Sequence, residues 1–232
     1  MKRPFVTANF AITADGRIST RKRTPSDFSS ARDKRRLLEI RALCDAVLVG
    51  ARTLFADTMS LGLPAADLRA AREKRGLSSQ PLRVVVSNSG KLSPELRVFT
   101  GGEVVVFSTT RMPARTRDAL AQKCDLFLHD APLVNLSAAL ATLREDYGVK
   151  RLVCEGGGTL FRAFAEAGLV DELHLTLCPR IFGGKGAVTL TGVAGGFLPR
   201  SVELRIKEMI PLGDECFVVA TPSRASLSPP PK

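Results

Sequence analysis

The feature that most constrains this chain is a series of nine short apolar runs, spread over most of its 232 residues. Each run is rich in β-branched or aliphatic residues and has the length of a single strand. The predicted strands are Phe5–Thr13, Asp45–Val49, Leu82–Ser87, Glu103–Phe107, Asp125–His129, Arg151–Cys154, Glu172–Leu177, Glu203–Ile210 and Cys216–Thr221. Many of the intervening segments have apolar residues at helical spacing. The predicted helices are Ser30–Leu43, Pro113–Lys123, Leu136–Tyr147 and Thr159–Ala167.

Strands that alternate with helices predict fold class α/β, a three-layer α/β/α arrangement with a mostly parallel sheet covered on both faces. The last two strands are an exception, because residues 211–214 are too few for a crossover and indicate a hairpin turn. We therefore expect a mixed sheet with an antiparallel C-terminal hairpin. Its apolar edge strands are expected at 172–177 and 216–221. One domain is expected over residues 1–222, followed by a disordered Pro/Ser tail over 223–232.

The chain carries a formal net charge of +11, which indicates an anionic partner. Nucleic acid, anionic lipid and a phosphorylated small molecule satisfy this balance equally well, so charge alone does not select one. A single tyrosine, no tryptophan and no interleaving of aromatic with basic residues argue against a nucleic-acid partner. The charged segment Arg69–Gly76 is expected to be a solvated surface helix or loop.

The cysteines and histidines indicate whether disulfides or a metal site are expected. Three of the five cysteines lie in apolar runs and no two form a CxxC pair, which is typical of reduced core thiols in a cytoplasmic protein. No apolar run approaches the roughly 18 residues of a membrane span, so no membrane partner is expected. His129 and His174 lack partners at ligand spacing, and we expect them to be structural, with no metal site.

The sharpest local motif is Leu152–Thr159, in which an apolar strand runs into Glu155, three glycines and the start of a helix. Glycines let the backbone approach an anion closely, and the free N–H groups of a helix N-terminus favour negative charge. The motif is neither a dinucleotide fingerprint, because Phe161 stands where glycine is needed, nor a P-loop. It predicts a phosphate cradle, and the alternative is a tight strand-to-helix turn that binds nothing.

Two further predicted strands end in polar residues. Gly50 is followed by Arg52 and Thr53 at the start of a helix, and the next strand ends in Ser87 and Asn88. Because ligands of open α/β sheets collect at the carboxyl ends of the strands, these residues predict more anion contacts, as a dinucleotide would require. Ordinary caps and turns remain the alternative.

Together with the opening segment, these strand ends make the chain resemble the riboflavin-biosynthesis pyrimidine reductase family, whose fold is similar to that of dihydrofolate reductase. The motifs that carry the resemblance span residues 4 to about 220. They are Ala14–Ile18, Ile40–Ala42, Asp45–Ala46, Gly50, Thr53, Asp57, Pro81–Val86, Glu155–Leu160, Gly168–Leu173 and Pro179–Gly184. Because no zinc-deaminase signature is found, the chain resembles the stand-alone archaeal and fungal members more than the bifunctional bacterial enzymes.

The resemblance implies NADPH-dependent reduction of the ribosyl group of a 5-amino-6-ribosylaminopyrimidine 5′-phosphate to ribityl, by a homodimer. It leaves open whether the pyrimidine is the diamino-pyrimidinone or the uracil form. The cofactor-binding residues that it implies are Ala11, Gly50, Arg52, Thr53, Ser87, Asn88, Gly156, Gly157, Gly158 and Thr159. Arg52 and the strand end Ser87–Ser89 would favour NADPH over NADH by holding the 2′-phosphate, and Lys91 or Arg111 are the alternatives.

The implied substrate-binding residues are Asn9, Ser26, Arg41, Asp57 and Glu155. Asp57 and Glu155 are the catalytic candidates, since their carboxylates would bind ribose hydroxyls and one would move the proton at C1′. Arg41 suits the substrate phosphate because its planar fork makes bidentate contacts. The alternatives are a surface cation for Arg41 and a helix or turn cap for Asp57.

The chain departs from the family pattern at several positions. Pro64 stands about where an arginine or histidine often contacts the substrate, and Arg69 or Arg72 could replace that contact. Asn9 replaces a lysine of the bacterial bifunctional enzymes. The shared fold also permits reduction of a folate or another pterin, but folate reductases resemble one another in a Pro-Trp loop and this chain has no tryptophan.

Overall fold

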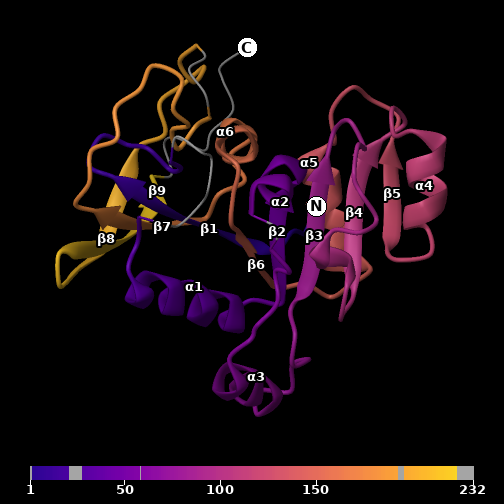
Figure 1. Ribbon diagram of the computed structural model, residues 1–232, viewed down its shortest axis with the longest axis horizontal. Helices are drawn as coiled ribbons and strands as arrows, with labels where there is room; N and C mark the ends of the chain where they lie inside the picture. The colour runs from indigo at the N-terminus through magenta and orange to yellow at the C-terminus, as the bar shows by residue number, and fades with distance from the viewer. Residues whose placement is uncertain (1, 21–27, 58, 193–195, 224–232) are drawn as a thin grey trace. The chain divides into compact units, whose positions relative to one another are not determined.

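A computed structural model describes residues 2–20, 28–57, 59–192 and 196–223. Its strands are β1 (Phe5–Thr13), β2 (Ala46–Gly50), β3 (Leu82–Ser87), β4 (Val104–Thr109), β5 (Asp125–His129), β6 (Arg151–Cys154), β7 (Glu172–Cys178), β8 (Leu204–Leu212) and β9 (Glu215–Pro222). The helices are α1 (Ala31–Leu43), α2 (Ala51–Asp57), α3 (Ala66–Glu73), the 3-10 helix η1 (Arg97–Phe99), α4 (Ala114–Leu120), α5 (Leu136–Glu145) and α6 (Gly158–Glu166). Figure 1 shows these elements along the chain.

The strands form a sheet of order β5-β4-β3-β2-β6-β1-β7-β9-β8. The pairs β2–β3, β3–β4, β4–β5 and β1–β7 are parallel, and β7–β9 and β8–β9 are antiparallel. The predicted fold class is therefore confirmed, including the antiparallel C-terminal hairpin. The turn of that hairpin is Gly213–Asp214, where Gly213 adopts a φ of 64° that favours glycine.

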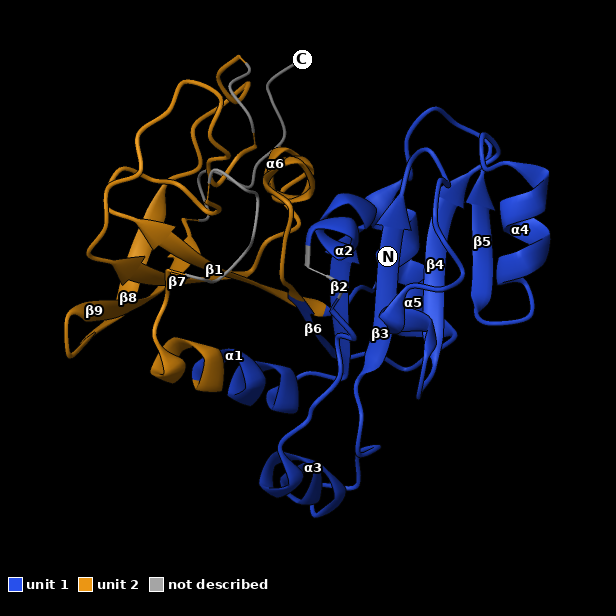
Figure 2. Ribbon diagram, in the orientation of Figure 1, with its two compact units in different colours: residues 1–4, 36–153 blue, residues 5–35, 154–232 orange. Residues whose placement is uncertain are grey.

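The chain divides into two compact units, coloured separately in Figure 2. Unit 1 contains residues 1–4 and 36–153, and unit 2 contains residues 5–35 and 154–232. The single domain over residues 1–222 stays a prediction.

In unit 1, strands β2, β3 and β4 are buried on both faces, as the near-continuous apolar runs predicted, whereas β5 at the end of the sheet has only exposed and half-buried residues. One core cluster takes alternate residues of the strands of this unit, namely Val47, Val49, Val85, Val104, Val106 and Val153. The intervening residues Leu48, Val84, Val86, Val105 and Phe107 are also buried. Helix α2 packs against β2 and β3, and α5 buries four side chains, so helices cover the sheet of this unit.

Helix α3 corrects the expectation for the charged segment 69–76. Arg72 is 2% exposed, and its guanidinium donates hydrogen bonds to the carbonyl oxygens of Arg41, Ala42 and Cys44. These carbonyls lie at the C-terminus of α1, where a helix leaves them without partners of its own. The prediction of a solvated surface is confirmed for Ala70, Ala71 and residues 73–76, which are exposed, and it was wrong for Arg72, which closes the end of α1.

Unit 2 corrects the predicted sheet edges. The predicted edge strands, 172–177 and 216–221, are internal, because β7 pairs with both β1 and β9, and β9 pairs with both β7 and β8. Strand β8 lies at the end of the sheet and is exposed along almost its whole length. Its apolar side chains include Ile206 and Met209, each more than half exposed. The sequence showed that these strands exist but did not reveal their order.

The remaining sequence expectations concern the thiols, the tail and membrane spans. All five cysteines are free thiols, and Cys44, Cys154 and Cys178 are buried. Ser223 of the predicted tail still pairs with Glu203, through its N–H to the carbonyl oxygen at 2.8 Å. The rest of the tail, 224–232, lies outside the described residues. No helix among the described residues is long and apolar enough to cross a membrane.

Candidate active site

The carboxyl ends of β2, β3 and β4 lie at one edge of the sheet of unit 1. Their register aligns Gly50 with Val86, and Ser87 with Ser108. Helix α2 begins directly after Gly50, with Arg52 exposed and Thr53 half-buried. Neither side chain has a hydrogen bond or ion pair to another described residue. The structure thus brings three of the predicted cofactor residues together, with their polar groups available.

Ser87 and Asn88 lie at the same edge, but their side chains are engaged in the turn that follows β3. Ser87 Oγ accepts a hydrogen bond from the N–H of Gly90 at 3.1 Å, and Asn88 Oδ1 accepts one from the N–H of Val134 at 2.9 Å. Gly90 has a φ of 63°, and a Cβ there would overlap Met112. These contacts hold the turn in place. The two cations named as alternative contacts for the 2′-phosphate are therefore the stronger candidates at this edge. Lys91 and Arg111 are both exposed there.

In unit 2, the glycine motif connects β6 to α6. Gly156 and Gly157 have φ values of 150° and 83°, in the region that favours glycine. Gly158 requires glycine for another reason, because a Cβ would overlap the backbone of Thr189 and Gly192. Thr159 is exposed in the first turn of α6, which contains no acidic residue. The geometry fits an anion cradle, and it equally explains the glycines as the requirements of a tight turn.

Strand β1 of unit 2 holds two predicted ligand contacts. Asn9 and Ala11 are half-buried, two residues apart, and thus lie on the same face of the strand. The Asn9 amide has no hydrogen bond to another residue that the structure describes. In register, Asn9 faces His174 of β7, whose Nε2 lies 2.7 Å from Glu172 Oε1. His174 therefore has a local partner, consistent with its predicted structural role.

Two of the sequence motifs meet in unit 2. The carboxylate of Asp15 accepts hydrogen bonds from Thr13 Oγ1 at 2.5 Å and from the N–H groups of Gly183 and Phe182 at 2.7 and 3.2 Å. These bonds, with that from Thr13 the strongest, lower the pKa of Asp15 to about 2. Asp15 thus joins the segment after β1 to the segment after β7.

The remaining acidic candidates are only partly described. Glu155 is half-buried directly after β6. Asp57 is the last residue of α2, and its side chain lies outside the described part of the chain. Ser26 is also outside the described residues. Among the residues that are described, no group of three or more His, Cys, Asp or Glu could hold a metal ion.

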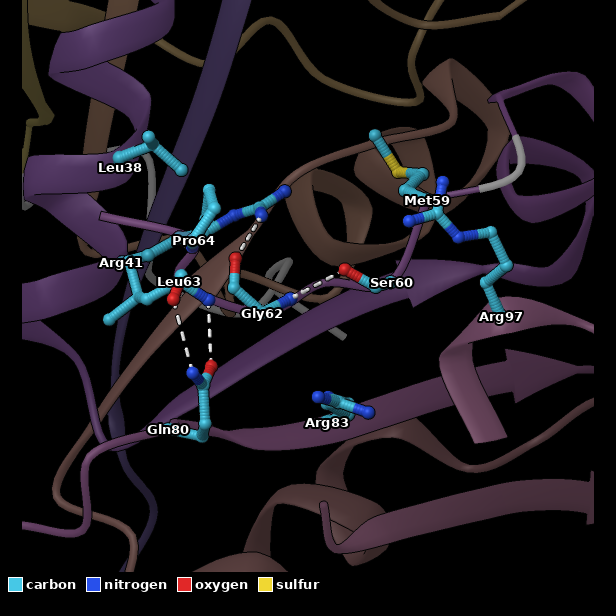
Figure 3. Close-up of a pocket in the computed structure, with 10 residues that line it drawn as sticks. All are labelled: Leu38, Arg41, Met59, Ser60, Gly62, Leu63, Pro64, Gln80, Arg83 and Arg97. Carbon is cyan, nitrogen blue, oxygen red and sulfur yellow. Dashed lines mark hydrogen bonds between the residues drawn. The ribbon is translucent and has the colours of Figure 1, made fainter. Parts of the chain in front are cut away.

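Unit 1 contains a cavity of about 450 Å³ that includes Arg41 (Figure 3). Its lining residues are Leu38, Arg41, Met59, Ser60, Gly62, Leu63, Pro64, Gln80, Arg83 and Arg97. Arg41 is 6% exposed and donates from Nη1 to the carbonyl oxygen of Gly62 at 2.9 Å. It is therefore not the surface cation that the alternative interpretation assumed.

Gln80 holds the loop that forms one wall of this cavity. Its Oε1 accepts from the N–H of Leu63 at 2.7 Å, and its Nε2 donates to the Leu63 carbonyl at 3.1 Å. This pair of bonds fixes the backbone of Leu63 in the way that a neighbouring strand would. The wall that carries Ser60, Gly62 and Pro64 is thereby held in place.

Arg69 and Arg72, either of which could have replaced the contact at Pro64, do not line the cavity. Arg69 Nη1 donates to the carbonyl oxygens of Leu63 and Pro64 at 3.0 and 2.6 Å, and Arg72 is buried against α1. Arg83 and Arg97 line the cavity instead, and the sequence analysis missed both. Arg83 had a detectable signal, because it is the second residue of a strand whose other residues are almost all apolar.

Comparison with solved structures shows which proteins share this fold. Over 95% of its length the chain superposes on a pyrimidine reductase-like protein from Corynebacterium diphtheriae, covering 92% of that chain with a TM-score of 0.79 at 20% identity. A TM-score of 0.69 at 18% identity relates it to the riboflavin biosynthesis reductase Rib7 of Saccharomyces cerevisiae, with 95% and 90% coverage. These similarities establish a shared fold.

Sequence comparison gives the family. Residues 4–218 match the RibD C-terminal domain. The chain is 32% identical over 222 residues to the 2,5-diamino-6-ribosylamino-4(3H)-pyrimidinone 5′-phosphate reductase of Methanothermobacter thermautotrophicus, covering 94% of this chain and 98% of that protein. It is 33% identical over 189 residues to the reductase of the same name from Archaeoglobus fulgidus, with 81% and 86% coverage. The chain belongs to the RibD C-terminal domain family.

Proposed function

We propose that this protein reduces the ribosyl group of 2,5-diamino-6-ribosylamino-4(3H)-pyrimidinone 5′-phosphate to ribityl in riboflavin biosynthesis, using NADPH. The observation that carries the proposal is the match to two archaeal reductases of that name, over 94% and 81% of this chain and 98% and 86% of theirs. Those names also favour the diamino-pyrimidinone over the uracil form, which the sequence motifs left open.

The residues at the carboxyl edge of unit 1 fit the anionic parts of NADPH. Gly50 leaves the backbone open to close approach, and Arg52 is an exposed cation without a partner among the described residues. Lys91 and Arg111 add positive charge at the same edge. We propose that Arg52 provides the main contact to the 2′-phosphate. The backbone after β6, from Gly156 to Thr159, is proposed to hold the pyrophosphate.

The chemistry requires a ribose that has opened to a carbonyl or imine at C1′. Bound NADPH supplies the hydride to that carbon. Glu155 and Asp57 are proposed to accept hydrogen bonds from ribose hydroxyls, which fixes the position of C1′, and one of them moves the proton that accompanies reduction. Asn9 is proposed to contact the substrate, because its amide has no partner among the described residues.

We also propose that the protein is a homodimer. Strand β8 ends the sheet and exposes four apolar side chains, Leu204, Ile206, Met209 and Ile210. An exposed apolar edge strand needs cover, and a second copy supplies a surface of the same chemistry. Light scattering at micromolar concentration should give twice the chain mass of 25.0 kDa. A mass of one chain would contradict the dimer.

Substitution of Glu155 tests the assignment of the substrate side. We expect Glu155→Gln to lower kcat by about 100-fold, because the amide cannot accept a proton, while NADPH affinity stays within about twofold. Glu166→Gln, an exposed position in α6, is the matched control and should retain full activity. An equal loss of NADPH affinity in Glu155→Gln would show that Glu155 belongs to the cofactor site.

A further inference from the structure

We propose that Asp33 binds the pyrimidine ring of the substrate and selects the diamino-pyrimidinone over the uracil form. This inference rests on the proposed function, because it assumes that the substrate is a phosphorylated aminopyrimidine. Asp33 lies in the first turn of α1, where the sequence motifs gave it no role. Its carboxylate is proposed to accept hydrogen bonds from the 2-amino group and from the N3–H of the ring.

Asp33 is a buried carboxylate that the protein leaves only partly paired. It is 7% exposed, and its Oδ1 accepts a hydrogen bond from Thr176 Oγ1 at 2.6 Å. Its Oδ2 has no hydrogen bond or ion pair within the described chain. The two oxygens of a carboxylate together can accept about four hydrogen bonds, so Asp33 has room for further donors. Because a buried charge without such partners is costly, a ligand that donates to Asp33 would stabilise it.

A second buried carboxylate near Asp33 strengthens this argument. Burial raises the pKa of the Cys178 thiol to about 12, the negative charges of Glu215 and Asp33 contribute to that rise, and Arg180 opposes it. Both carboxylates therefore act on the same thiol, and they repel each other. Glu215 is satisfied by Ser30, whose N–H and Oγ donate to its two oxygens at 2.7 and 2.5 Å. Asp33 is the carboxylate that still lacks donors.

The sheet of unit 2 places Asp33 beside the proposed substrate contact on β1. Thr176, which holds the carboxylate, is in register with Ala11, and Asn9 is two residues from Ala11 on the same face. Two residues of a strand span about 7 Å, which suits a single ring between Asp33 and Asn9. Ala11 is half-buried, and its small side chain lets a planar ring approach the strand closely.

The two forms of the pyrimidine differ at the position that a carboxylate distinguishes. In the diamino-pyrimidinone, the 2-amino group and the N3–H are adjacent donors in one plane, a pattern that matches the two oxygens of a carboxylate. In the uracil form an oxygen replaces the 2-amino group, so two acceptors would face each other. A site that hydrogen-bonds a substrate group rejects the analogue that lacks this group, because its own polar atoms are then left unpaired. N3 lies opposite C6, so this contact leaves the ribosylamino group free to react.

Asp33→Asn is the sharpest test, because asparagine keeps the size of the side chain and an oxygen that can accept from Thr176. We expect kcat/KM for the diamino-pyrimidinone 5′-phosphate to fall about 100-fold, while that for the uracil analogue stays within about threefold. Dissociation constants of the two compounds, measured by calorimetry without NADPH, should change in the same way. NADPH affinity should not change.

Glu215→Gln is the matched control, since Glu215 is a similarly buried carboxylate of the same unit. It is expected to lower thermal stability and to keep the preference of the parent. An Asp33→Asn variant with the preference of the parent would overturn the proposal. An equal loss of preference in Glu215→Gln would also overturn it, because that result would indicate a general effect of charge.

Substitution of Thr176 tests the same contact if Asp33→Asn does not fold. Thr176→Val removes the hydroxyl that orients the carboxylate and should lower the preference about tenfold, whereas Thr176→Ser keeps the hydroxyl and the preference. Equal preference in these two variants would refute the role of Asp33. A parent enzyme that reduces both pyrimidines equally well would refute the selection but not the reduction. A parent that reduces neither would instead refute the proposed function.

Discussion

Arg72 and Arg83 lie in the same unit, are almost equally buried, and both donate hydrogen bonds to backbone carbonyls, yet their surroundings differ. Burial lowers the pKa of each guanidinium. For Arg72 the negative charge of Asp45 opposes that shift, whereas for Arg83 the positive charge of Arg41 adds to it. The carboxylate of Asp45 thus offsets part of the effect of burial on Arg72, although the positive charge of Arg75 acts in the opposite direction, whereas no negative charge offsets it for Arg83.

The two environments meet at the C-terminus of α1. Arg72 donates to the carbonyl oxygens of Arg41 and Ala42, at 3.4 and 3.3 Å, while the side chain of Arg41 lines the cavity. Helix α3 therefore supports the residue that the family resemblance assigns to the substrate phosphate. A substitution in α3 acts on stability, and one in the cavity acts on binding, which makes the difference measurable.

The largest effect is expected for Arg72→Met. This change leaves several carbonyl oxygens buried without donors, so the free energy of unfolding should fall by about 3–5 kcal/mol. The melting temperature should fall by roughly 10 °C for a chain of this size. Phosphate should still raise the melting temperature of the variant. The control is Lys74→Met, at an exposed position directly after α3, and a loss of less than about 1 kcal/mol in Arg72→Met would contradict the role of α3.

A smaller loss of stability is expected for Arg83→Met, about 2–3 kcal/mol. The variant loses the hydrogen bonds to Val98, Thr100 and Gly101, but it also removes the repulsion from Arg41. In contrast to Arg72→Met, it should not be stabilised by phosphate, because Arg83 lines the cavity beside Arg41. Thermal unfolding with and without phosphate, at constant ionic strength, distinguishes the two variants. If both respond to phosphate equally, the comparison between the two arginines is wrong.

Arg52 is an exposed arginine, in contrast to the buried Arg72 and Arg83. We expect Arg52→Ala to change cofactor binding and to leave stability unchanged. We expect NADPH binding to weaken by about 1.5–3 kcal/mol, the scale of a hydrogen bond to a charged group. NADH binding should scarcely change, because NADH lacks the 2′-phosphate. Fluorescence titration with both nucleotides measures this difference. If both bind the variant as they bind the parent, then Lys91 or Arg111 holds the 2′-phosphate instead.

Local sequence patterns predicted the strands almost completely. All nine predicted strands are found, with bounds that differ by at most two residues, because apolar runs of this length and composition have few alternatives once turns separate them. The hairpin at Gly213 was predictable for the same reason. The strand order was not, because it depends on contacts between distant segments. The prediction that 172–177 and 216–221 are the edge strands was wrong because it required the strand order.

The sequence predicted only those parts of the candidate site that lie at the end of a single strand. Gly50, Arg52 and Thr53 are neighbours in sequence and in space, so their pattern was visible. The cavity instead joins Arg41, Arg83 and Arg97, which are far apart in the sequence. The burial of Arg72 was missed for a related reason, because the charged residues between positions 69 and 75 suggested solvent exposure, and only the packing of α3 shows which of them is buried.

The most direct test of the account is the loss of NADPH absorbance with 2,5-diamino-6-ribosylamino-4(3H)-pyrimidinone 5′-phosphate as substrate. We predict turnover that consumes one NADPH for each ribityl product, with slower turnover of the deaminated uracil analogue and of the dephosphorylated compound. Dihydrofolate should not be reduced. A folded protein that binds NADPH but leaves the pyrimidinone phosphate unchanged, or that reduces dihydrofolate instead, would contradict the proposed function.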